Sequence, residues 1–253
     1  MNNKDLLGKR IDLLDQGWLE LQDIMGDDLA IINAARTSFL GESKGDIKDK
    51  KLLFYLMKNN HSTPFENVVF KFRIKCPLFV ARQWMRHRTW SYNEVSRRYT
   101  SESIEFHIPN EWRYQDKQNR QSSSSILPER IDRELSWECA TKGISGNVQG
   151  YTHVYSLGEL LEKYCMIGEG IYNCLIDNNV TREQARFFLP INLFTEFVAT
   201  VDAHNLMHFL KLRMDSHAQY EIRVYADAIY EHFFKPALPW TAEAFEKYRL
   251  GNK

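Results

Sequence analysis

A short segment of the sequence concentrates positive charge. Between Arg82 and Arg98 it holds five arginines and one histidine but a single acid, Glu94. The whole chain is neutral, with 33 basic and 33 acidic residues in 253. Because a guanidinium forms two-pronged hydrogen bonds with phosphate or carboxylate, several arginines in so short a segment indicate a pocket for a compact anion. From charge alone, a solvated basic helix end explains the cluster equally well.

Polar and aromatic residues interleaved with the arginines favour the pocket. Hydroxyl, amide and carboxylate groups can hydrogen-bond a sugar or a base, and aromatic rings can stack on a planar ring, although such rings more often belong to the core. These residues are Ser91, Asn93, Glu94, Ser96, Trp84, Trp90, Tyr92 and Tyr99. Together they indicate a nucleotide site. A nucleic-acid-binding protein is the alternative, but the neutral charge and the Asn and Glu inside the cluster argue against it.

The spacing within the cluster carries a family resemblance. Arg86, His87 and Arg88 are followed after seven residues by Ser96, and this resembles the signature of the flavin-dependent thymidylate synthases. The longer family pattern RHRxxSxNExSxRY is met through Tyr99. The resemblance covers roughly residues 11–114 and 156–245, and includes in the family's order the segments ARTSF, HSTPFENVVFKF, FVARQWMRHR, REQARFFLP and LRMDSHAQYEIR.

This resemblance implies an FAD-dependent methyltransferase that makes dTMP from dUMP. Family members take the one-carbon unit from methylenetetrahydrofolate and reducing electrons from NADPH through FAD, and they resemble one another in being homotetramers. The sequence has no GxGxxG fingerprint, so no Rossmann unit supplies the flavin site. We therefore expect FAD as the cofactor, dUMP, folate and NADPH as small-molecule partners, and neither nucleic acid nor a membrane.

The family's dUMP contacts carry over to seven positions. They are Gln83, Arg86, Glu94, Ser96, Arg98, Arg186 and Arg213. Arg98 and Arg186 would hold the phosphate, with Ser96 adding a hydroxyl donor. Arg213, the one catalytic residue that the resemblance implies, would lie near the uracil and favour negative charge on the ring, which makes C5 more nucleophilic.

The family's FAD contacts carry over to a second set of positions. They are Ser38, His61, Thr63, Glu66, Arg86, His87, Arg88 and Glu94, followed by Asp202, His204 and His208. His87 and its two arginines would face the flavin or its pyrophosphate. At the last three positions family members often carry Asn, Arg and Asn, and an acid beside a phosphate-bearing cofactor is unexpected. A catalytically impaired homologue that binds nucleotide or flavin is therefore the alternative function.

Three residue types invite other chemistry. Ser96 as a nucleophile lacks a recognisable histidine–acid pair beside it in the sequence. His204 and His208 stand four apart and could ligate a metal, but no third ligand has a convincing spacing, so no metal is expected. Cys76 precedes Pro77 after a predicted strand and is expected to be a buried packing residue.

Cysteine usage and hydropathy bear on location. The four cysteines form no CxxC pair, the N-terminus has no apolar signal-peptide region, and no apolar run approaches the roughly 18 residues that span a bilayer. These features predict a cytoplasmic protein with reduced thiols.

Strand patterns early in the chain and helical patterns later predict an α+β fold with a mixed or antiparallel sheet and packed helices. Strands are expected at 10–26, around a turn at Gly17, and at 67–75 and 102–108. Helices are expected at 26–39 (with Leu29, Ile32 and Ala35 on one face), 48–61, 77–88, 156–179, 182–189 (started by a capping box of Thr181 and Gln184), 197–213 and 217–234. We expect a single domain over 1–253, with a flexible insertion at about 115–150 that carries a short helix.

Overall fold

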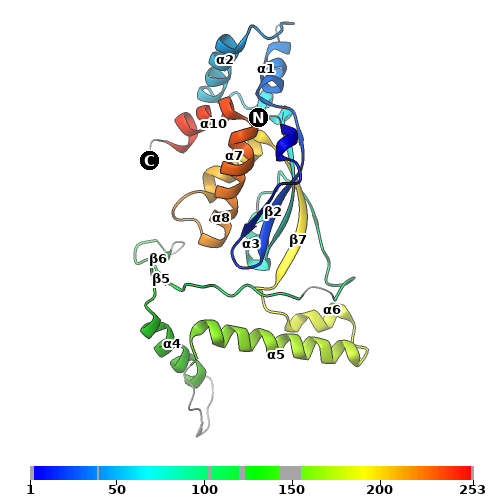
Figure 1. Ribbon diagram of the computed structural model, residues 1–253, viewed down its shortest axis with the longest axis vertical. Coiled ribbons are helices and arrows are strands. Elements are labelled where there is room, and N and C mark those ends of the chain that lie inside the picture. The colour runs from blue at the N-terminus through cyan, green and yellow to red at the C-terminus, as the bar shows by residue number, and fades with distance from the viewer. Residues whose placement is uncertain (1–2, 39, 102–103, 120–122, 143–154, 252–253) are drawn as a thin grey trace. The chain divides into compact units, whose positions relative to one another are not determined.

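The computed structural model describes residues 3–38, 40–101, 104–119, 123–142 and 155–251 (Figure 1). Its contacts divide the chain into two compact units. The first unit comprises Met1–Cys76, Val80–Val95 and Thr195–Lys253, and the second comprises Pro77–Phe79 and Ser96–Phe194. The expectation of a single domain stays a prediction.

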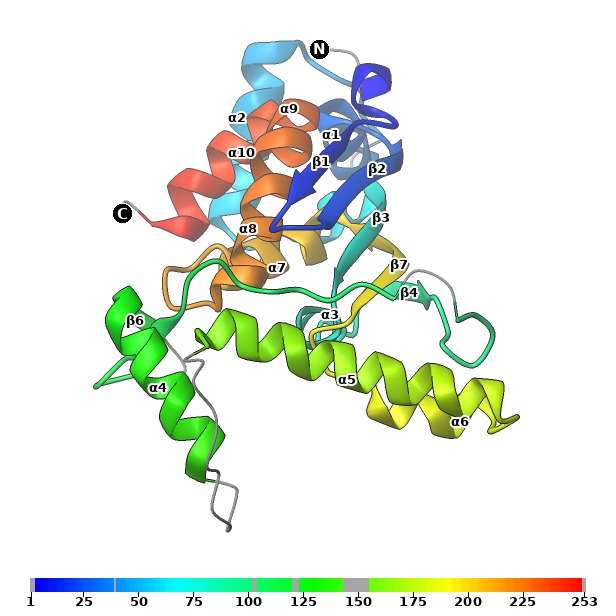
Figure 2. The same cartoon turned by 60° about the horizontal axis from the view of Figure 1, so that its bottom comes forward.

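A five-stranded sheet organises the first unit (Figure 2). Its strand order is β1 (Arg10–Leu13), β2 (Gly17–Met25), β3 (Val69–Pro77), β7 (Phe194–Asp202) and β4 (Ser91–Glu94). The pairs β1–β2, β2–β3 and β4–β7 are antiparallel. The predicted α+β class is therefore confirmed.

Alternation along β3 places one face of the sheet in the core. Phe70 and Phe72 are fully buried, whereas the residues that follow each of them, Lys71 and Arg73, are exposed. The buried rings meet aromatic residues of the C-terminal helices: the centroid of Phe72 lies 5.9 Å from that of Phe233. Burying each such side chain contributes roughly 1.5–3 kcal/mol. The helical elements concerned are α8 (Tyr220–Ile229), the π-helical turn η4 (Tyr230–Phe234) and α9 (Lys235–Ala237).

Three further helices pack together in the first unit, namely α1 (Asp28–Thr37), α2 (Asp46–Lys58) and α10 (Pro239–Phe245). The π-helical turn η5 (Glu246–Leu250) follows α10. The buried carboxylate of Asp28 accepts hydrogen bonds from the backbone of Trp240 and Thr241, and so satisfies amides that open α10. The expected core face of α1 was partly wrong. Leu29 is 41% exposed, because the face turned inward carries Asp28, Ile31 and Ile32.

The segment 197–213 corrects the prediction of one long helix. Residues up to Asp202 form strand β7, and only α7 (Ala203–Arg213) is helical. Phe197, Ala199 and Val201 are buried in alternation, which is the period of a strand. Pairing with β4 satisfies the strand's backbone groups, and this tertiary contact overrides the helical pattern that follows.

The second unit contains the hairpin β5 (Arg113–Gln115) and β6 (Ser123–Ile126), then α4 (Glu129–Lys142), α5 (Leu157–Asp177), α6 (Arg182–Ala185) and the 3-10 turn η3 (Arg186–Phe188). The short helix expected within 115–150 is confirmed as α4, and the hairpin was not foreseen. Residues 120–122 and 143–150 of that expected insertion lie outside the described residues.

Two local predictions in the second unit were wrong. Thr181 makes no side-chain cap, and the expected helix 182–189 breaks into α6 and η3; the capping box forms instead at Ser156 and Glu159, where it starts α5. In the expected strand 102–108, the described residues form a single bridge, from Phe106 to Leu193. Within the described ranges, no helix is both long enough and apolar enough to cross a bilayer.

Two glycines of α5 give a matched pair of predictions. A Cβ at Gly168 would lie 2.5 Å from the carbonyl oxygen of Phe188, whereas one at Gly170 would meet nothing within 4 Å. We expect Gly168→Ala to lower the free energy of unfolding by about 1–3 kcal/mol through overpacking. Gly170→Ala should raise it by roughly 0.5–1 kcal/mol through helix propensity. Urea denaturation of both variants measures the contrast, and equal stabilities would contradict the close approach of α5 to Phe188.

Candidate active site

The arginine-rich segment begins at the end of α3 (Leu78–Trp84), continues through a turn at 85–90 and enters β4. Trp84 anchors the turn, because its buried ring stacks on Phe209 of α7 at 4.9 Å and meets Trp90 edge-on at 5.9 Å. The Tyr92 hydroxyl lies 3.0 Å from the carbonyl oxygen of His87. The apolar packing therefore fixes the backbone that carries Arg86, His87 and Arg88.

Two of the arginines point to solvent. Arg86 and Arg88 are exposed, and among the described residues neither side chain forms an ion pair or hydrogen bond. Their neighbours in the first unit are tied to the protein: the Gln83 amide donates to Gln219, and the Glu94 carboxylate accepts from Thr195 at 2.8 Å. The two guanidiniums thus remain available for an anion.

His87 and Arg213 form a partly buried contact within the first unit. Arg213 Nε donates to His87 Nε2 at 3.1 Å, and its Nη2 lies 3.4 Å from the carbonyl oxygen of Gln83. Because Nε2 accepts this hydrogen bond, His87 is neutral and carries its proton on Nδ1. Burial, together with the charges of Arg213 and His208, lowers the pKa of His87 from 6.5 to about 4. The imidazole of His87 therefore supports Arg213, and the expectation that it faces the flavin stays a prediction.

This contact predicts how His87 titrates. In the folded protein we expect its imidazole NMR signals to titrate near pH 4 and to move to a higher pH in Arg213→Gln, since one repelling charge is removed. The unfolded chain takes up this proton at a higher pH than the folded chain, so His87 should reduce stability as pH falls from 6.5 towards 4 and have no effect above 6.5. A midpoint near 6.5 in both proteins would contradict the contact.

The remaining predicted dUMP residues lie in the second unit. Arg98 Nε is 3.9 Å from the Glu183 carboxylate, and Arg186 Nε donates to the Glu183 carbonyl oxygen at 3.3 Å. The Ser96 hydroxyl oxygen accepts from the backbone amide of Arg98 at 3.3 Å. The two arginines expected to hold phosphate therefore gather around one residue, and the 3.9 Å ion pair is long enough to be exchanged for a ligand.

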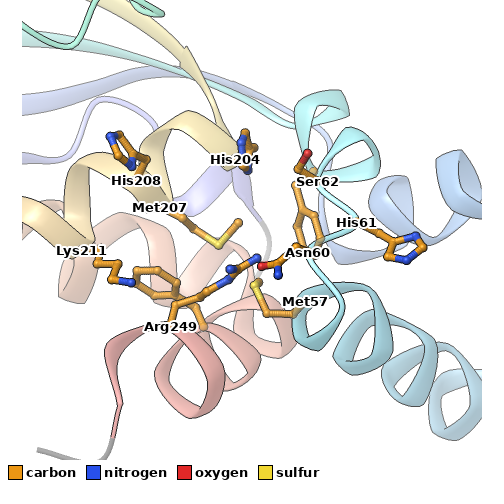
Figure 3. A pocket seen from close by; sticks show the side chains of 11 residues that line it. Met57, Asn60, His61, Ser62, His204, Met207, His208, Lys211 and Arg249 are labelled. Atoms are coloured by element: carbon orange, nitrogen blue, oxygen red, sulfur yellow. The ribbon is translucent and has the colours of Figure 1, made fainter.

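Two pockets in the first unit collect five of the eleven residues expected to bind FAD. The large pocket, of about 990 Å³, is lined by Ser38, His61 and Thr63. The small pocket, of about 240 Å³, is lined by His61, His204 and His208. Both pockets share the segment Asn60–Ser62, and Figure 3 shows the small pocket from close by.

These linings fit an extended dinucleotide. The large pocket presents the hydroxyl of Thr37 and the amides of Asn59 and Asn67 besides Ser38 and Thr63, groups that suit sugar hydroxyls and phosphates. Its volume lies at the upper end of the range of about 300–1,000 Å³ typical of ligand sites. The polar groups and the size of this pocket are therefore compatible with FAD. Within the described ranges, no three His, Cys, Asp or Glu side chains gather as a metal site would require.

Asp202 has another task in this structure. Its carboxylate caps α7 by accepting from the amide of Asn205 at 2.9 Å and from that residue's side chain at 2.6 Å. Asp202 and Glu66 line neither of the two pockets. The acid that was unexpected beside a phosphate is thus used by the helix N-terminus.

Comparison with known proteins assigns the family. The model of the family "Thymidylate synthase complementing protein" matches residues 20–240. The chain belongs to this family. It is 44% identical over 239 residues to the flavin-dependent thymidylate synthase of Thermotoga neapolitana, with 94% of this chain and 95% of that protein covered. It is also 44% identical to the Thermus thermophilus protein of the same name, over 95% of this chain and 79% of that one.

A solved structure extends this comparison. The UMP/dUMP methylase PolB of Streptomyces cacaoi, bound with 5-Br dUMP, superposes with a TM-score of 0.76 at 28% identity. The match covers 96% of this chain and 100% of that one. The sequence-based resemblance to the thymidylate synthase family is confirmed.

Sequence reasoning missed two cations of the small pocket. Lys211 follows His208 by one helical turn and carries a weak signal in that spacing. Arg249 lies near the C-terminus, outside the segments that resemble the family, and only the tertiary structure brings it to the pocket.

Proposed function

We propose that this chain is a flavin-dependent thymidylate synthase, which converts dUMP to dTMP with methylenetetrahydrofolate as carbon donor and NADPH as reductant. The observation that carries this proposal is identity of 44% to a protein of that name over 94% of the chain. The signature from Arg86 to Ser96 and the residues of both pockets support it.

The predicted nucleotide contacts are assigned roles on this basis. Arg98 and Arg186 bind the dUMP phosphate as two-pronged donors, and Ser96 adds a hydroxyl. Gln83, Arg86 and Glu94 complete the contacts to sugar and base.

Arg213 activates the uracil in this proposal. It is held by a neutral imidazole and a carbonyl oxygen, and among the described residues no acid pairs with it, so its charge is free to stabilise negative charge developing on the ring. A thiolate is not required. The Cys76 thiol is fully buried, as expected, and burial raises its pKa well above the ordinary value.

The two pockets would hold FAD, which when bound supplies the hydride that completes the methyl group. Ser38, His61 and Thr63 line the large pocket and His204 and His208 the small one. We assign Arg86 and Arg88 to the phosphates of either ligand.

Assembly and location are further parts of the proposal. Tyr164, Ile167 and Ile171 lie on one face of α5 and are 60%, 63% and 38% exposed, an apolar face that supports a homotetramer. We propose a cytoplasmic location, where the free thiols of Cys76, Cys165 and Cys174 stay reduced.

The test is dTMP formation, followed by chromatography. Purified protein is incubated with dUMP, methylenetetrahydrofolate, NADPH and FAD, and each component is omitted in turn. We expect dTMP only in the complete mixture. Folded protein that binds dUMP and forms no dTMP would favour the impaired homologue instead, and loss of FAD binding would locate the defect in the two pockets.

A further inference from the structure

The small pocket contains two cations that the assigned functions do not use. Lys211 reaches it from α7 and Arg249 from the C-terminal turn η5, and in Figure 3 the Arg249 guanidinium points into the pocket beside Asn60 and Met207. None of the residues lining the pocket is acidic. Among the described residues, neither Lys211 nor Arg249 forms an ion pair or a side-chain hydrogen bond. Two uncompensated positive charges therefore face one small cavity.

Part of the pocket lining is apolar and buried. It consists of Met57, Phe65, Met207 and Phe245, and each of these is at most 5% exposed. A wall of this kind excludes water and strengthens the attraction between the cations and an anion. Rings and thioethers also offer a surface to a planar or apolar part of a ligand.

Further polar groups line the same cavity. Ser62 adds a hydroxyl, Asn60 an amide, and His204 and His208 add ring nitrogens. A phosphate has enough acceptor oxygens to use an arginine fork, a lysine and several further donors together. A ligand with a phosphate beside an apolar or planar group matches this lining.

The size and position of the pocket further limit which kinds of ligand it could bind. About 240 Å³ is too small for a whole dinucleotide, but the pocket shares Asn60–Ser62 with the large pocket of about 990 Å³. A ligand lying along this shared segment would place one part in each pocket. Dinucleotides have such a form, with phosphates between or beside two ring systems.

We propose that Lys211 and Arg249 bind a phosphate of a dinucleotide in the small pocket. The proposal rests on the proposed function, which supplies two ligands with this chemistry, FAD and NADPH. Lys211 acts as a point charge and Arg249 as a two-pronged donor.

The test uses Lys211→Gln, Arg249→Gln and the double variant. Lys247→Gln is the matched control, because Lys247 lies in the same turn η5 but places its ammonium over the Tyr248 ring, 5.4 Å from its centroid, and does not line the pocket. Fluorescence titration gives the Kd of FAD and of riboflavin, which has no phosphate. Anaerobic flavin reduction gives the apparent Kd of NADPH. The Kd of dUMP checks that each variant is folded.

We expect the double variant to raise the Kd of one dinucleotide at least tenfold relative to Lys247→Gln, with dUMP unchanged. If the affinity for FAD falls and that for riboflavin does not, the phosphate belongs to FAD. If the affinity for NADPH falls and that for FAD does not, the phosphate belongs to NADPH. Changes below threefold for both dinucleotides, or an equal loss for riboflavin, overturn the proposal. Failure of wild-type protein to form dTMP would overturn the proposed function, and the binding measurements would still decide the role of this pocket.

Discussion

Replacing Arg213 with glutamine is expected to lower kcat for dTMP formation by about 100-fold to 1,000-fold, the usual effect of removing one preorganised donor from a site of developing negative charge. The structure explains why this side chain is suited to the task. The buried neutral imidazole of His87 accepts a hydrogen bond from Arg213 Nε at 3.1 Å. This contact orients the guanidinium, and because the imidazole carries no negative charge it does not neutralise the charge of the arginine. Saturating kinetics measure kcat separately from the Kd of dUMP.

The control for this substitution is Arg130→Gln, which removes an exposed arginine that pairs with Glu134 on α4. It should leave kcat unchanged. Arg213→Lys keeps the charge and should retain part of the activity. A change in kcat below threefold in folded Arg213→Gln would remove Arg213 from the mechanism.

The second large effect is expected from replacing Arg98 or Arg186 with lysine, which should weaken the binding of dUMP. We expect each single change to raise the Kd of dUMP by about tenfold to 100-fold, because lysine cannot make the two-pronged contact and a hydrogen bond to a charged group contributes about 1.5–3 kcal/mol. Isothermal titration with dUMP measures the loss.

Deoxyuridine, which has the same base and sugar without the phosphate, provides the matched ligand. Deoxyuridine should bind more weakly than dUMP, and its Kd should be the same in wild type and in both variants. If deoxyuridine loses as much affinity as dUMP, Arg98 and Arg186 contact another part of the nucleotide, and the phosphate assignment is wrong.

Much of the fold could be predicted where the hydrophobic residues follow a single period, either that of a strand or that of a helix. The alternation of Phe70, Phe72 and Ile74 identified β3, and the long run after Ser156 identified α5. The prediction was wrong at 197–202, a short segment in which four of six residues are apolar and which hydropathy alone cannot assign to a strand or a helix. The β-branched Val198, Thr200 and Val201 were the available signal for a strand.

The site was predictable as far as the family resemblance extends. The resemblance named the arginines, and the structure gave them surroundings that no spacing encodes: Arg213 on His87, and Arg98 and Arg186 around Glu183. Asp202 shows the limit clearly. Its residue type raised doubt about the flavin site, yet its use as a helix cap depends on where β7 ends and α7 begins, and the sequence pattern placed that boundary incorrectly.

The unpaired guanidiniums of Arg86 and Arg88 have a practical consequence for the choice of solution. Side chains that hold no internal anion will take one from the electrolyte, so phosphate or sulfate in a buffer should occupy the positions meant for a nucleotide. Ligands that bind only the folded chain stabilise it by mass action. The protein should therefore melt at a higher temperature in phosphate than in Tris chloride of equal ionic strength, while affinities for dUMP measured in phosphate will be underestimated.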